Sequence, residues 1–203
     1  MSYLHESTRF PYTTLFRSSD RDELAISMFE KVKSASYYVD AQLHLAEIYF
    51  AQNKPKESFA ILDGMQLALP ADQVKVLRAK AIFSSAQDKY LPAVELYEQV
   101  LKIEPANIEV LKAQSLLLYK LEQYVQYEAN LLKVLKLDDN DTDVLNALGY
   151  FYVEQKIKLD QAFTLLNKAL AIEPNSYYIL DSMGWYYFQV KEYDQALNYL
   201  NKA

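Results

Sequence analysis

From residue 19 onward, apolar side chains recur every three or four positions, as on the buried face of an amphipathic helix. The first such stretch has them at Leu24, Ala25, Met28, Phe29 and Val32. Ser19 or Asp20 can cap this helix, and the spacing predicts that it runs to about residue 34. Most of the abundant residue types are helix formers, and only three glycines and six prolines interrupt them. The sequence therefore predicts an all-α fold of about eleven helices.

The last sixty residues contain one pattern twice, at an offset of 34 or 35 residues. The matching pairs are Gly149 and Gly184, Tyr152 and Tyr187, Ala162 and Ala196, and Ala169 and Ala203. A fixed period of this size is typical of stacked helical repeats. Small residues let two antiparallel helices approach closely, and the tyrosines fill the wider gaps. Because one repeat cannot bury its apolar face alone, neighbouring repeats must stack.

This pattern resembles the tetratricopeptide repeat (TPR), a helix–turn–helix unit of about 34 residues. The resemblance implies a right-handed superhelical solenoid of antiparallel helix pairs, in which helix A of each repeat is followed by helix B. An array over residues 19–203 is expected, truncated at both ends. Its parts are a half-repeat at 19–37 and five units at 39–72, 74–107, 108–141, 142–176 and 177–203.

The prolines fit this arrangement. Pro55 and Pro92 are expected in the first turn of a B helix, where a missing N–H costs nothing. Pro70, Pro105 and Pro174 are expected just past B helices, where proline ends a helix.

Residues 1–18 lack helical periodicity and resemble the translation of a sequencing adapter. We expect this leader to be non-native or disordered and exclude it from the functional argument, as for a fusion scar. The native N-terminus is accordingly expected to be missing.

Composition narrows the functional classes. The formal charge is −6, and no run of Lys and Arg forms the basic stripe that binding to nucleic acid requires. The chain has no cysteine and no apolar run long enough for a membrane span. No nucleophile elbow or phosphate loop occurs. We therefore expect no enzymatic activity, no cofactor, no nucleic-acid partner and no transmembrane segment.

Two features suggest metal sites but match poorly. His44 has no Cys or second His nearby, so we expect a partly buried or groove-lining ring and not a zinc ligand. The acidic run 138–143 lacks the Gly and Glu that a calcium-binding loop needs at its sixth and twelfth positions, where Val144 and Tyr150 stand. It is better explained as a turn in which Asn140 or Asp141 caps the next helix.

In TPR arrays helix A faces a concave groove, so the resemblance implies that a partner binds there. The expected groove residues are Arg78, Lys112, Tyr119, Asn146, Tyr150, Tyr178, Asp181, Trp185, Phe188 and Gln189. The middle of this row is cationic, with Lys75 in addition to Arg78 and Lys112. Its C-terminal end is aromatic with polar neighbours, as in peptide-binding hot spots. The alternative is that a further repeat buries Trp185 and Phe188 as core.

The favoured function is a non-enzymatic scaffold that binds a protein or peptide segment. Its last repeats resemble exported or lipoprotein-anchored bacterial TPR proteins of cell-envelope assembly, which favours a periplasmic or outer-membrane-anchored location. The alternative is a regulatory or substrate-docking arm of a larger enzyme, such as a glycosyltransferase or peptidase. Leu197 and Leu200, on a helix that the sequence leaves uncapped, are expected to promote self-association.

Overall fold

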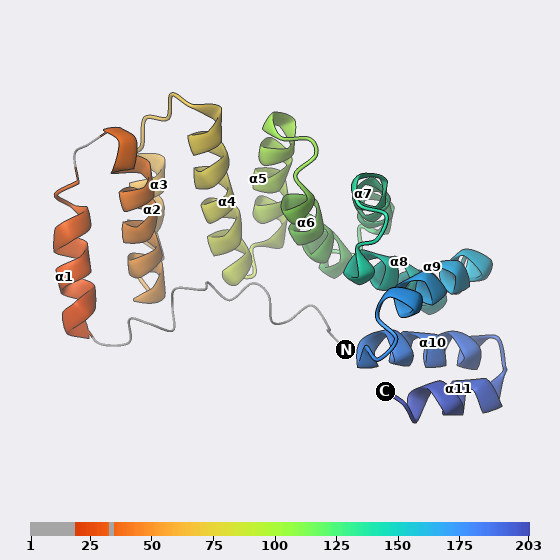
Figure 1. The fold of residues 1–203 in the computed structure, drawn as a ribbon. Helices are drawn as coiled ribbons and strands as arrows, with labels where there is room; N and C mark the ends of the chain where they lie inside the picture. The colour runs from red at the N-terminus through yellow and green to blue at the C-terminus, as the bar shows by residue number, and fades with distance from the viewer. Residues whose placement is uncertain (1–18, 33–34) are drawn as a thin grey trace. The chain divides into compact units, whose positions relative to one another are not determined.

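The computed structural model describes residues 19–32 and 35–203, so the leader at 1–18 lies outside the described residues. Within them the chain forms eleven helices and no strand, which confirms the predicted all-α class and helix number (Figure 1). The helices are α1 (Ser19–Phe29), α2 (Ala35–Ala51), α3 (Pro55–Asp63), α4 (Pro70–Ala86), α5 (Tyr90–Ile103), α6 (Ile108–Lys120), α7 (Tyr124–Leu137), α8 (Thr142–Glu154), α9 (Leu159–Ile172), α10 (Tyr177–Gln189) and α11 (Tyr193–Leu200).

Contacts between residues divide the chain into two compact units, and the boundary falls between Val110 and Leu111 within α6. We call these unit 1 and unit 2.

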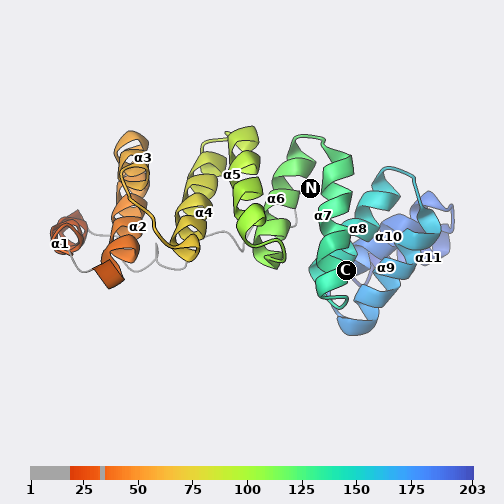
Figure 2. The ribbon, with the colours of Figure 1, turned by 90° about the horizontal axis from the view of Figure 1, so that it is seen from above.

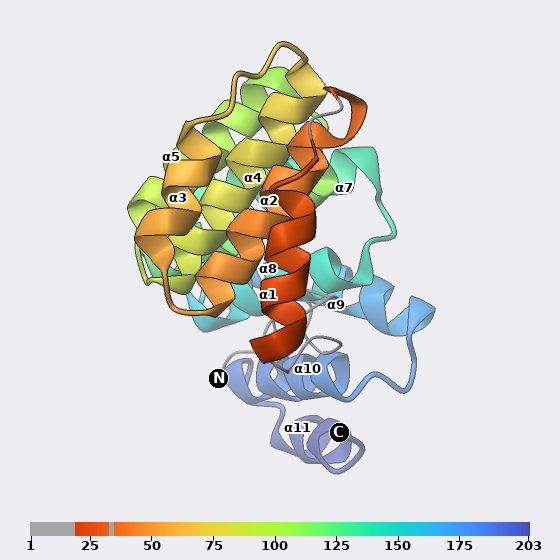
Figure 3. The same ribbon diagram turned by 90° about the vertical axis from the view of Figure 1, so that its left-hand side faces the viewer.

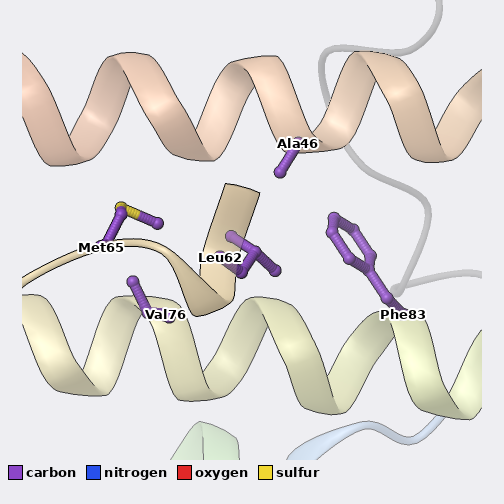
Figure 4. Close-up of a cluster of buried hydrophobic side chains, with 5 residues drawn as sticks. All are labelled: Ala46, Leu62, Met65, Val76 and Phe83. Atoms are coloured by element: carbon purple, nitrogen blue, oxygen red, sulfur yellow. The ribbon is translucent and has the colours of Figure 1, made fainter. Parts of the chain in front are cut away.

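In unit 1, consecutive helices from α1 to α5 pack on one another, and α4 contacts both α2 and α3. Figure 2 shows α4 and α5 side by side, and Figure 3 views the unit from the side of α1, which lies against α2. Apolar side chains from α2, α3, α4 and the connection between α3 and α4 form a core between these helices (Figure 4). Its buried members are Ala46, Leu62, Met65, Val76 and Phe83. Phe50 stacks on the Phe83 ring at 4.3 Å between centroids.

Unit 2 repeats this arrangement, because α10 packs on both α8 and α9 while α11 pairs with α10. The close approach predicted for the two repeated glycines is confirmed. A Cβ on Gly149 would lie 2.7 Å from Leu166 Cγ, and one on Gly184 would lie 2.7 Å from Leu200 Cγ. Ala162, on α9 opposite Gly149, is completely buried.

The turn after each A helix contains one residue in the left-handed region. These residues are Asn53, Asp88, Glu122, Lys156 and Lys191, with φ between 56° and 65°. In every one of these turns, the residue after the left-handed one donates its backbone N–H to the carbonyl five positions back. An example is the hydrogen bond from Ile157 to Tyr152. This bond ends the helix in a Schellman motif. The α8–α9 turn holds an extra residue, and Lys158 adopts a second left-handed conformation there. This insertion accounts for the 35-residue offset between the two glycines.

Two sequence predictions need correction. The helix expected to reach about residue 34 ends at Phe29, because Lys31 and Val32 donate to carbonyls three residues back and tighten the last turn. Pro70 does not follow helix B directly. It is the first residue of α4, seven positions after α3 ends, because its fixed φ suits a helix start while Leu69 before it stays extended.

Candidate partner-binding site

In unit 1, the cationic residues of the predicted groove are already paired. Arg78 on α4 donates to Glu109 Oε2 on α6 at 2.6 Å. Lys75 on α4 donates to Asp40 Oδ1 on α2 at 2.6 Å, and this hydrogen bond raises the pKa of Lys75 despite partial burial. These ion pairs link successive A helices. The cationic middle of the groove is therefore largely neutralised by acids on neighbouring helices.

In unit 2, Lys112 on α6 is held by two carboxylates. Its Nζ donates to Asp141 Oδ2 at 2.8 Å and to Asp143 Oδ2 at 3.2 Å. Burial opposes the charged form, but the hydrogen bonds and charges of the two acids outweigh it and raise the pKa of Lys112. Asp141 also caps α8, since it accepts from the Val144 N–H at 3.0 Å. The acidic run thus has the predicted capping role and binds a lysine in addition.

Tyr119 belongs to an aromatic cluster in unit 2, not to an open groove. Its ring lies 5.2 Å from that of Tyr127, which in turn meets Phe151 edge-on at 5.1 Å. The Tyr119 hydroxyl donates to Glu154. Burial first, and then this hydrogen bond, raise the pKa of Tyr119 well above its ordinary value. The ring packs between helices, and its polar tip is occupied.

Farther along unit 2, α8 and α10 bring polar groups together. The Tyr178 hydroxyl donates to Glu173 at 3.2 Å, and the charge of Asp143 is close enough to help raise the pKa of Tyr178, after the larger effect of burial. Tyr178 therefore lies beside the start of α8. Asn146, one turn along α8 from Asp143, is half-buried, and its Oδ1 accepts no hydrogen bond from the described residues. Tyr150 follows one turn later and is also half-buried.

The most exposed aromatic side chains of the predicted set lie on α10. Trp185 and Phe188 are 36% and 47% exposed, and their rings stack nearly parallel at 5.2 Å. Tyr178, Asp181, Trp185 and Phe188 are spaced by three or four residues and so share one face, which we call the α10 face. Gln189 at the end of the helix is half-buried. The structure therefore places the aromatic end of the predicted row on one continuous helix surface.

Sequence reasoning missed three residues that contribute to this region. Tyr193 starts α11, and its ring contacts Phe188 at 5.8 Å, which extends the exposed aromatic surface. Glu154 accepts a hydrogen bond from the hydroxyl of Tyr119 in the aromatic cluster, and Glu173 accepts one from the hydroxyl of Tyr178. Glu154 ends α8, Glu173 follows the end of α9 and Tyr193 starts α11. All three lie outside the repeat positions used for the prediction, so only the three-dimensional arrangement reveals them.

Evidence for a metal site is lacking in the part of the chain that the structure describes. No group of three His, Asp or Glu residues there is arranged to hold an ion. His44 packs against the ring of Phe29 at 5.4 Å, and its Nδ1 lies 3.1 Å from Glu47 Oε2. Among the described helices, none has both the length and the apolar character that a membrane crossing needs.

Known proteins share the repeat pattern at low identity. No model of a known protein family matches the chain. A TPR repeat-containing protein of Pseudomonas aeruginosa is 27% identical over 181 residues, which are 88% of this chain and 30% of that protein. An uncharacterised protein of Sinorhizobium fredii is 29% identical over 93 residues, which are 46% of this chain and 50% of that protein. The chain spans half or less of the length of these relatives.

Solved structures share the fold. A TPR protein of Parabacteroides merdae superposes with a TM-score of 0.68 at 17% identity, over 89% of this chain and 70% of its own. MamA of Desulfovibrio magneticus gives 0.67 at 17% identity, over 81% and 92%. At such identities the likeness establishes the fold alone. The helix pairs and the repeated left-handed turns give the chain the all-α fold of TPR solenoids, in agreement with its similarity to the named TPR repeat-containing relative.

Proposed function

We propose that the chain is a non-enzymatic protein-interaction scaffold and that the α10 face is the centre of its binding site. The observation that carries the proposal is the exposed stacked pair of Trp185 and Phe188 beside polar groups. Large aromatic side chains with few torsions, next to hydrogen-bonding partners, are typical anchors of protein interfaces.

The other side chains of α10 already have packing partners within unit 2. Met183 is completely buried, Tyr186 contacts the Phe163 ring at 5.3 Å, and Tyr187 stacks on Tyr199 at 5.3 Å. Trp185 and Phe188 contribute little to that packing, because they lie on the opposite side of the helix. Their exposed ring surface is available to a second molecule.

The distribution of charge supports a protein partner over a nucleic acid. Every cationic residue predicted for the groove is held by a carboxylate of a neighbouring helix in its own unit. Phosphate recognition needs unpaired Lys and Arg side chains. The finer proposal, a role in assembly at the cell envelope, rests on the resemblance of the last two repeats.

Selection from a displayed library of random peptides against the full chain tests the proposal. Peptides that bind this site should lose about 30-fold in affinity when Trp185→Ala removes the anchor, since hot-spot aromatics contribute roughly 2 kcal/mol or more. The control is Val125→Ala on α7, which changes a side chain that is 80% exposed and outside the α10 face. The proposal is wrong if the selected peptides bind the Trp185→Ala and Phe188→Ala variants as well as the unchanged protein.

A further inference from the structure

We infer that the segment bound by the α10 face is cationic, with a Lys or Arg side chain that pairs with Asp181 beside apolar side chains that cover Trp185 and Phe188. This inference rests on the proposed function and specifies the chemistry of the partner.

Ion pairs between successive A helices follow a recurring pattern. Arg78 reaches from α4 to Glu109 on the next A helix, and Lys112 reaches from α6 to Asp143 on the next. Both cations occupy the same position in their repeats, 34 residues apart. At this position a charged side chain points to whatever lies beyond its helix and meets the opposite charge there.

Asp181 occupies this position on α10, 69 residues after Lys112, which corresponds to two repeats. Asp181 is negatively charged, whereas the residues at this position on α4 and α6 are positively charged. Its side chain is half-buried, and no ion pair or hydrogen bond engages its carboxylate among the described residues. On α4 and α6, the cation at this position pairs with Glu109 or Asp143 of the next A helix. A helix or extended segment lying along the α10 face would instead meet the unpaired negative charge of Asp181.

The surroundings of Asp181 strengthen the negative charge. Asp143 acts on Tyr178 through its charge, and Glu173 accepts from the Tyr178 hydroxyl, so both acids lie near the same end of α10. Lys112 is already bound to two carboxylates. Lys191 follows α10, but ten residues separate it from Asp181, about 15 Å along a helix axis. The start of the α10 face therefore attracts cations.

The spacing along α10 defines the segment. Asp181 precedes Trp185 by four residues and Phe188 by seven, or about 6 Å and 10 Å along the axis. A Lys or Arg that reaches Asp181 would thus be followed by an apolar side chain about two residues away in an extended peptide, or one turn away in a helix. Trp185 can also attract a cation through its ring face.

The same peptide selection, followed by charge reversal, tests this inference. Peptides that lose affinity with Trp185→Ala should be enriched in Lys or Arg placed about two residues, or one helical turn, from an apolar residue. For such a peptide, Asp181→Asn should lower affinity about threefold and Asp181→Lys about tenfold at low salt, with a smaller effect at high salt. Replacing the peptide's cation by Glu should restore binding to the Asp181→Lys variant. Asp194→Asn, at an exposed acid in the first turn of α11, is the matched control and should leave affinity unchanged.

The outcomes separate the two claims. Peptides that depend on Trp185 but are acidic or neutral, and that bind Asp181→Lys normally, overturn the cationic partner and leave the scaffold function standing. Failure of every selected peptide to depend on Trp185 or Phe188 overturns the proposed function itself. Sedimentation at increasing concentration gives a further check: a dimer that Trp185→Ala dissolves would show that a second copy occupies the face, and the inference would then be wrong.

Discussion

The backbone of Gly149 lies directly against the side chain of Leu166, so that a Cβ at position 149 would come within 2.7 Å of Leu166 Cγ and 2.9 Å of its Cδ2. Leu166 is completely buried and cannot move aside. Gly184 faces Leu200 at the same 2.7 Å, but Leu200 is 44% exposed at the end of α11. The same contact between glycine and leucine thus occurs in both repeats, but only Leu200 can shift toward solvent.

This difference predicts unequal effects of the same substitution. Gly149→Ala should destabilise the protein by about 1–2 kcal/mol, because overpacking exceeds the gain of about 1 kcal/mol from better helix propensity. Gly184→Ala should be neutral or slightly stabilising, because Leu200 can shift toward solvent. Urea unfolding of both variants measures the difference. Equal effects at the two positions would contradict the packing argument.

At the left-handed turn residues, substitution by glycine is expected to stabilise the protein. Lys156 has φ 56° and an exposed side chain, and an L-residue in this conformation is strained by about 1 kcal/mol. Lys156→Gly should therefore raise the free energy of unfolding by roughly 0.5 kcal/mol after the larger chain entropy of glycine is subtracted. Lys133→Gly, on an exposed position inside α7, is the control and should cost about 1 kcal/mol. A thermal unfolding midpoint for Lys156→Gly below that of the unchanged protein would contradict the expectation.

The sequence predicted the parts of the structure that depend on local spacing. Helix number and the capping role of Asp141 follow from residues within a few positions of each other, and the close approach at the glycines follows from the repeat of about 34 residues. Pro70 was misplaced because proline suits both the end of one helix and the start of the next.

The candidate site was predicted less completely. Arg78 and Lys112 were correctly placed on A helices, but their acidic partners lie about 30 residues away, and pairing across helices depends on rotamers that periodicity does not encode. Trp185 was identified because it belongs to the row of aromatic residues on the last A helices. Tyr193, which extends its surface, was missed because it belongs to the next helix.

Because Asp141 both caps α8 and binds Lys112, we expect it to contribute more to the stability of the protein than Asp143 does. Asp141→Ala removes both the cap of α8 and the closer partner of Lys112, and should cost about 2 kcal/mol. Asp143→Ala removes only a half-exposed ion pair and should cost less than about 0.5 kcal/mol. A double-mutant cycle of Asp141→Ala with Lys112→Met in urea should give a coupling energy of about 0.5–1 kcal/mol. A coupling near zero would show that Asp141 stabilises only as a cap.

The raised pKa values of three tyrosines in unit 2 predict that the protein loses stability at alkaline pH. Burial first raises the pKa of Tyr119, Tyr127 and Tyr152, and hydrogen bonds donated to Glu154 and Glu128 raise those of Tyr119 and Tyr152 further. In the unfolded chain these phenols ionise near pH 10. The folded protein then holds more protons than the unfolded one, so this stabilising contribution is complete below about pH 10 and is lost as pH rises toward the folded pKa values.

Alkaline titration followed by tyrosinate absorbance checks this. Of the 18 tyrosines, a subset should remain protonated in the folded protein after the exposed ones have ionised, and should titrate only as helicity is lost. Tyr152→Phe should reduce that subset and weaken the pH dependence of unfolding, because it removes one phenol whose ionisation the fold opposes. Complete titration of all tyrosines before any loss of helical circular dichroism would show that the aromatic cluster around Tyr127 and Phe151 admits charge, and would contradict this prediction.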